Sequence, residues 1–185
     1  METGALARLG GAKLRESLGH RTAPGAEFAY TDFPAVMPHM QALTREGTDA
    51  DLRATFDWLQ SQAFVKKEEI SAVGYCMGGR VAFAANAILP LKCAISYYGG
   101  GIPNGSLDRV ASLHGPQLFF WGEKDKHIPP EQRATVIDAL KQSGKSYVNV
   151  EFSDADHGFS CDARPSYNPT ATRQAWALTL EFLRS

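Results

Sequence analysis

Residues 72–80 read Ala-Val-Gly-Tyr-Cys-Met-Gly-Gly-Arg and carry the clearest structural signal in the chain. An apolar, strand-like run ends at Cys76, and a helix-like run follows from Arg80 to Ile88. A strand, a sharp turn and a helix in this order are typical of a nucleophile elbow, whose turn residue has a strained backbone and an exposed side chain. We expect Gly74 and Gly78 to be required there, because a Cβ at either position would crowd the turn.

A thiol at this turn would lie over the N-terminus of the following helix. The helix dipole and the free amides favour a thiolate at that position, and the amide of Met77 is placed to donate to a developing oxyanion. Two other interpretations of residues 72–80 stay open: a buried structural cysteine in a glycine-rich turn, and a nucleotide-binding turn. The second lacks the Gly-x-Gly-x-x-Gly spacing and the Lys-Ser/Thr ending of a P-loop.

The composition indicates an ordinary globular domain. The chain has 185 residues, of which 44% are hydrophobic and 21% charged, and a net charge of -1. We therefore expect a single domain over residues 1–185, with an irregular segment at residues 1–35, and neither a nucleic-acid nor a membrane partner. No apolar run approaches the roughly 20 residues of a membrane span. The odd number of cysteines, without metal-ligand spacing, suits a reducing cytoplasm; they are Cys76, Cys93 and Cys161.

Strand-like and helix-like runs alternate along the chain from residue 49 onward. The expected strands are 69–75, 92–98, 117–121 and 147–152. The expected helices are 49–62, 79–88, 106–112, 130–142 and 170–183, the first capped by Thr48. Such alternation predicts an α/β fold, a mostly parallel sheet with helices on both faces in a three-layer sandwich. In such sheets functional residues collect after the carboxyl ends of the strands.

Two residues with catalytic potential follow expected strands. Asp125 comes after the strand 117–121, and His157 comes after the strand 147–152. Nucleophile, acid and histidine thus occur in the chain order of α/β-hydrolases, with Cys76 in the place of serine. The chemistry needs all three, because the imidazole moves the proton of the thiol and the carboxylate orients the imidazole. The alternatives within reach are Glu123, Asp154 and Asp156 for the acid, and His127 for the histidine.

These motifs resemble those of the dienelactone hydrolase family (carboxymethylenebutenolidases) of α/β-hydrolases. Residues 74–79 are similar to the family's cysteine nucleophile motif, 122–129 to its acid loop and 157–159 to its histidine loop. Residues 21–25, Arg-Thr-Ala-Pro-Gly, are similar to a segment whose arginine helps to hold the substrate carboxylate. The likeness extends over about residues 18–184.

The resemblance implies an ester or lactone hydrolase with Cys76, Asp125 and His157 as its catalytic triad. It implies an oxyanion donor at Met77, a substrate-binding role for Arg21, and hydrolysis of cyclic enol-lactones or other small esters through a thioester. It implies no metal and no cofactor.

The chain also departs from the family pattern. No strand-like run of usable length precedes residue 69, so the chain resembles an α/β-hydrolase truncated at its N-terminus. A second family arginine, four residues after His157, is replaced by Cys161, with Arg164 out of place. A bare apolar edge on the strand 69–75 would invite pairing with another chain, and a homodimer is the expectation.

Two other functions remain open from sequence. The chain could be a non-catalytic or weakly active remnant of the family that acts through a protein partner. Cys76 could alternatively be a redox-sensing thiol, since a thiolate at a helix N-terminus is reactive, although no resolving cysteine is evident.

Overall fold

The computed structural model describes residues 34–35, 37–38 and 42–185. The chain packs as two compact units, Met1–Ala54 and Thr55–Ser185, whose boundary falls within helix α3 (Arg45–Ser61). The single domain over residues 1–185 therefore stays a prediction. The irregular segment expected at residues 1–35 lies almost wholly outside the described residues.

Helix α3 begins four residues before the expected start at residue 49, and its N-terminal cap differs from the prediction. The hydroxyl oxygen of Thr44 accepts a hydrogen bond from the amide of Gly47 at 3.0 Å, as a capping side chain does. The hydroxyl of Thr48 instead donates to the carbonyl of Thr44, one turn earlier, at 2.9 Å. The prediction of Thr48 as the cap is wrong, because Thr44 occupies the earlier capping position.

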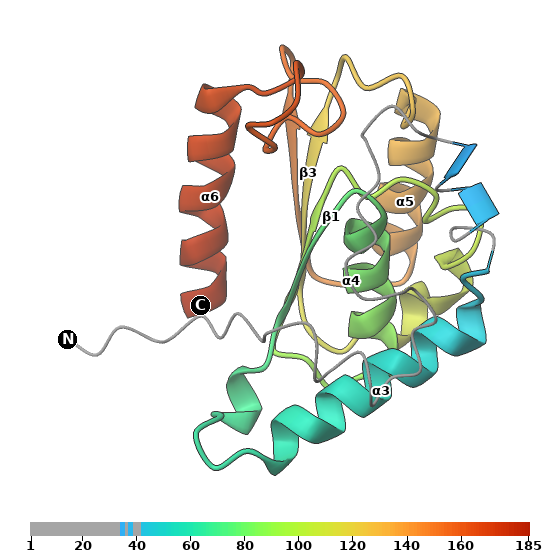
Figure 1. Cartoon of the computed structure of the whole chain (residues 1–185), viewed down its shortest axis with the longest axis vertical. Coiled ribbons are helices and arrows are strands. Elements are labelled where there is room, and N and C mark those ends of the chain that lie inside the picture. The colour runs from blue at the N-terminus through green and yellow to red at the C-terminus, as the bar shows by residue number, and fades with distance from the viewer. Residues whose placement is uncertain (1–33, 36, 39–41) are drawn as a thin grey trace. The chain divides into compact units, whose positions relative to one another are not determined.

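The second unit contains a four-stranded sheet in the order β1-β2-β3-β4, in which every neighbouring pair is parallel. Its elements are η1 (Lys67–Glu69), β1 (Ala72–Tyr75), α4 (Met77–Ile88), β2 (Ala94–Tyr97), η2 (Leu107–Ser112), β3 (Gln117–Gly122), α5 (Pro130–Gln142), β4 (Tyr147–Phe152) and α6 (Pro169–Arg184). Helices α4 and α5 lie on one face of the sheet and α6 on the other (Figure 1). The predicted α/β sandwich of three layers is confirmed.

Two elements differ from their predictions in extent or type. Strand β1 begins at Ala72, because residues 67–69 form a 3₁₀ turn instead of the first residues of the strand. Residues 107–112 form a 3₁₀ helix and not an α-helix. Helix α5 has the predicted bounds, since Pro130 fits the first turn of a helix.

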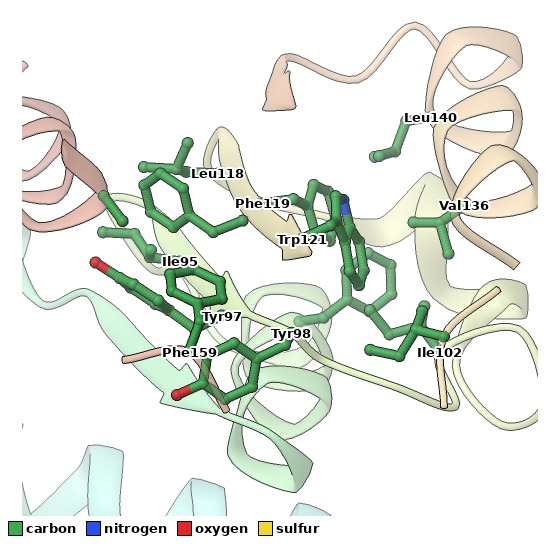
Figure 2. Packing of buried hydrophobic residues seen from close by; sticks show 14 of the residues in the cluster. Ile95, Tyr97, Tyr98, Ile102, Leu118, Phe119, Trp121, Val136, Leu140 and Phe159 are labelled. Atoms are coloured by element: carbon green, nitrogen blue, oxygen red, sulfur yellow. The ribbon is translucent and has the colours of Figure 1, made fainter. Parts of the chain in front are cut away.

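The core lies around the two central strands. All residues of β2 and β3 are buried, as expected for strands covered on both faces. Leu118 and Phe119 are successive residues of β3, so their side chains enter the core on opposite faces of the sheet. Figure 2 shows them among the other large buried side chains, including Tyr97 of β2 and Val136 of α5. Within the described ranges, no helix is both long and apolar enough to span a bilayer.

Candidate active site

The turn between β1 and α4 has the backbone of an elbow. Cys76 has φ 54° and ψ -122°, a region that non-glycine residues rarely adopt, and α4 begins at the next residue. A Cβ on Gly74 would overlap the carbonyl group of Gly78, so the turn requires a glycine there. The expectation for Gly78 is wrong, since a Cβ at that position meets open space. Gly79 is the other position in the turn that leaves no room for a side chain, because a Cβ added there would lie 2.8 Å from the carbonyl oxygen of Tyr97.

The structure brings the cysteine, the histidine and the aspartate together above the carboxyl ends of three strands. Nε2 of His157 lies 3.1 Å from Sγ of Cys76. Nδ1 of the same ring lies 2.8 Å from Oδ2 of Asp125. The imidazole therefore connects the thiol to the carboxylate with one hydrogen bond on each ring nitrogen.

Asp125 is fixed by the loop between β3 and α5. Its carboxylate is almost fully buried, with a side-chain exposure of 1%. Oδ1 accepts hydrogen bonds from the amides of His127 at 2.8 Å and Ile128 at 3.3 Å, while Oδ2 faces His157. Both oxygens are thus occupied, and the carboxylate cannot rotate away from the imidazole without losing them.

The pKa values of the three groups are shifted in the directions that favour a thiolate and an imidazolium. The hydrogen bond from His157 is the largest cause that lowers the pKa of Cys76, against the opposing effect of burial. Burial alone would lower the pKa of His157, but its bonds to Asp125 and Cys76 raise that pKa to about 9. Burial alone would raise the pKa of Asp125, but the bond and the charge of His157 lower it. A group of this kind suits nucleophilic catalysis.

The sequence of this chain is similar to those of known proteins. The sequence profile of the "Dienelactone hydrolase family" matches residues 21–185. The chain belongs to the dienelactone hydrolase family. A Synechocystis relative named "Putative carboxymethylenebutenolidase" is 30% identical over 94% of this chain and 74% of its own length. A "Carboxymethylenebutenolidase" of Pseudomonas is 33% identical over 73% of this chain, which spans only 55% of that relative's length.

A solved structure of the same family has the same fold. The crystal structure titled "Putative Dienelactone Hydrolase from Klebsiella pneumoniae" superposes with a TM-score of 0.76 and 27% identity, over 84% of this chain and 68% of that chain. Membership of the dienelactone hydrolase family makes this chain a member of a group of enzymes that hydrolyse carboxylic esters and lactones.

The alternative acids have other contacts. The carboxylate of Asp156 accepts a hydrogen bond from the backbone amide of His157 and not from its ring. The carboxylate of Asp154 accepts from the side-chain amide of Asn168 at 3.0 Å. Glu123 is exposed. His127, the alternative histidine, lies with its ring edge against the ring of His157.

Arg164 lies closer to the site than its spacing from the histidine loop indicates. Gly158 has φ 79°, and a Cβ on it would lie 2.7 Å from Nη1 of Arg164. The amide of Cys161 donates to the carbonyl of Gly158, and the amide of Arg164 donates to that of Cys161, so two successive turns reverse the chain. The charge of Arg164 contributes, after His157, to the lowered pKa of Cys76. In the sequence, Gly158 indicates a turn after His157 and is a signal that could have indicated this placement.

The remaining predicted residues have different outcomes. The amide of Met77 begins α4 next to the thiol and also lowers the pKa of Cys76 through a backbone hydrogen bond. Arg21 lies outside the described residues.

Proposed function

We propose that this protein is a cysteine-dependent hydrolase of small carboxylic esters or lactones, with Cys76 as the nucleophile. The observation that carries the proposal is the chain of two hydrogen bonds from the thiol through His157 to Asp125, at 3.1 Å and 2.8 Å. Each member has the residue type and the contact that its role in a nucleophilic triad needs.

In the first half-reaction, the thiolate of Cys76 attacks the carbonyl carbon and forms a C–S bond. The carbonyl oxygen becomes an oxyanion, which accepts a hydrogen bond from the amide of Met77. When the intermediate collapses, the bond to the leaving oxygen breaks and the imidazolium of His157 gives its proton to that oxygen. The products are a free alcohol, or the tethered hydroxyl of an opened lactone, and a thioester on Cys76.

In the second half-reaction, the neutral imidazole of His157 takes a proton from water, and the resulting hydroxide attacks the thioester carbonyl. The C–S bond breaks, the carboxylic acid leaves, and the thiolate and imidazolium are restored. Asp125 remains ionised throughout and stabilises the imidazolium. The strained backbone at Cys76 keeps the sulfur at the rim of the sheet in both steps.

The test is hydrolysis of 4-nitrophenyl acetate by the wild type and by Cys76→Ala. We expect kcat/KM to fall by a factor on the order of 10⁴ in the variant, because nucleophile and base act as a unit. Cys93→Ser is the matched control and should retain turnover, since Cys93 is buried away from the triad beside Ser71. Undiminished turnover in Cys76→Ala would reject the assignment, and one acyl group per thiol without turnover would indicate a remnant.

Arg21 is proposed to bind a carboxylate on the substrate. A charged hydrogen bond of this kind typically contributes about 1.5–3 kcal/mol. Arg21→Ala should therefore raise KM at least about tenfold for an ester that carries a carboxylate and leave KM unchanged for its neutral amide analogue. Equal effects on the two substrates would remove Arg21 from substrate recognition.

We also propose that two copies pair along the edge of β1. In the described part of the chain β1 pairs with β2 alone, and the amides of Ala72 and Cys76 donate to that neighbour. Val73 and Tyr75 therefore direct their backbone groups away from β2, and the two residues are 39% and 44% exposed. Analytical ultracentrifugation should detect a dimer at micromolar concentration that Val73→Pro abolishes. A wild-type monomer would contradict this pairing.

The cytoplasmic location stays a prediction.

A further inference from the structure

His127 contacts two members of the triad at once. Its backbone amide donates to Oδ1 of Asp125 at 2.8 Å, while the other oxygen of that carboxylate faces Nδ1 of His157. The ring of His127 meets the ring of His157 edge to face, with centroids 5.2 Å apart and planes at 70°. One residue thus supports the carboxylate through its backbone and touches the imidazole with its side chain.

The position of His127 is fixed by its neighbours on both sides. Asp125 precedes it in the buried turn, and Ile128 follows it with only 2% of its surface exposed. The carbonyl of Ile128 accepts a hydrogen bond from Nη1 of Arg133 at 2.9 Å, and Pro129 leads directly into α5. The side chain of His127 is nevertheless exposed, so its replacement leaves no cavity in the core.

Both hydrogen bonds of His157 depend on the rotation of its ring about the Cβ–Cγ bond. A rotation about that bond swings Nδ1 and Nε2 away from Asp125 and Cys76 and weakens both bonds, since hydrogen bonds weaken with distance and angle. Rings packed against the imidazole restrict this rotation further, and two lie there among the described residues: His127 and Tyr98, each with a centroid 5.2 Å from that of His157.

Of these two rings, only His127 can be changed without disturbing the core. Tyr98 is 3% exposed, has φ 39°, and also packs edge to face against Phe159. We propose that His127 is a positioning residue that holds the imidazole of His157 in the rotation at which Nε2 faces Cys76. This role deepens the proposed function and rests on it, because it concerns the same imidazole.

The experiment compares His127→Ala, which removes the ring, with His127→Phe, which keeps an aromatic ring at the same position. Lys126→Ala is the matched control on the same loop, since Lys126 is exposed beside His127. Three quantities are measured in each variant. They are the rate constant for alkylation of Cys76 by iodoacetamide at pH 6, kcat and KM for 4-nitrophenyl acetate, and the melting temperature.

In His127→Ala we expect the alkylation rate and kcat to fall about three- to tenfold, the range that loss of one aromatic pair predicts. KM should stay unchanged, because a positioning residue acts on the imidazole and not on the substrate. The melting temperature should fall by no more than about 5 °C, because the ring is exposed and its loss leaves no cavity in the core. His127→Phe should recover most of the loss, and Lys126→Ala should match the wild type.

If His127→Ala has the alkylation rate and kcat of the wild type, His127 is not a positioning residue. The role is also overturned if both quantities are as low in His127→Phe as in His127→Ala. A wild type whose Cys76 is alkylated rapidly but which hydrolyses no ester would reject the proposed function alone. In that case the alkylation rates still decide whether His127 positions the imidazole. A wild type without preferential alkylation of Cys76 would overturn both proposals.

Discussion

Strands β1 and β3 are each followed by a residue of the candidate site, Cys76 and Asp125, but these two residues are held in different ways. Strand β3 is paired on both sides and all its residues are buried, so the loop that carries Asp125 starts from a strand held in the core. Strand β1 is paired only with β2 among the described residues, and Val73 and Tyr75 are exposed. Cys76 is therefore positioned mainly by the local backbone of its elbow, and Asp125 by a hydrogen-bonded loop that begins at a buried strand.

The largest effect should come from the elbow. Gly74→Ala would place a Cβ against the carbonyl group of Gly78, where only a backbone shift can relieve the overlap. We expect a loss of more than about 4 kcal/mol in the free energy of unfolding, or no folded protein. Urea denaturation monitored by circular dichroism measures this change in unfolding free energy. Gly78→Ala, which meets open space, is the control and should change stability by less than about 1 kcal/mol.

The core of β3 should give the next largest effect. Leu118 is 0% exposed, so Leu118→Ala should cost about 2–5 kcal/mol of unfolding free energy through lost contacts and a cavity. Val73→Ala on the exposed side of β1 should cost less than about 1 kcal/mol. Similar values for the two variants in urea denaturation would contradict the contrast between the two strands.

A smaller effect should follow from the ion pair beside β3. Arg133 is buried, contacts Glu151 of β4 at 3.1 Å and donates to the carbonyl of Ile128. Arg133→Met should lower the unfolding free energy by about 1–3 kcal/mol, because it leaves buried acceptors unpaired. The exposed Arg184–Glu181 pair is the control, and Arg184→Ala should change stability by no more than about 0.5 kcal/mol in thermal unfolding. Equal losses of unfolding free energy in Arg133→Met and Arg184→Ala would show that the buried pair contributes no more than the exposed pair.

The smallest effect is a shift in the pH profile of kcat/KM. Its acid limb belongs to Cys76, which follows β1, and its alkaline limb to His157, which follows β4 and is bonded to Asp125 after β3. The rate should fall as the pH drops through the lowered pKa of Cys76, because the thiolate is protonated. It should fall again as the pH rises through about 9, because His157 loses the proton that it gives to the leaving group. Asp125→Asn should move the alkaline limb to lower pH, since the carboxylate that raises the pKa of His157 is gone. If the alkaline limb of Asp125→Asn lies at the same pH as in the wild type, that limb reports the titration of a group other than His157.

The sequence was sufficient to predict the strands, because residues buried on two faces form continuous apolar runs. The run 117–121 corresponds to β3, which extends only one residue further. Chain order was likewise enough to expect that Cys76, Asp125 and His157 approach one another, since parallel strands bring their carboxyl ends to one rim. The start of α3 was missed because two threonines at the correct spacing compete for the cap.

Features that depend on side-chain packing across loops could not be predicted. Spacing alone cannot show that Gly79 and not Gly78 approaches β2, because both fit the motif equally well. Arg164 was set aside for its spacing, yet the turns after Gly158 return it to the site. His127 was weighed only as an alternative histidine, and its ring contact with His157 required coordinates.

The most direct test of an activated thiol is alkylation of the three cysteines by iodoacetamide at pH 6, followed by intact mass and peptide mapping. We expect Cys76 to react first, and Asp125→Asn to slow its reaction at least about tenfold. Cys93, whose pKa is raised by burial, serves as the internal standard. Equal reactivity of Cys76 and Cys93, or a rate at Cys76 that is unchanged in Asp125→Asn, would contradict the account.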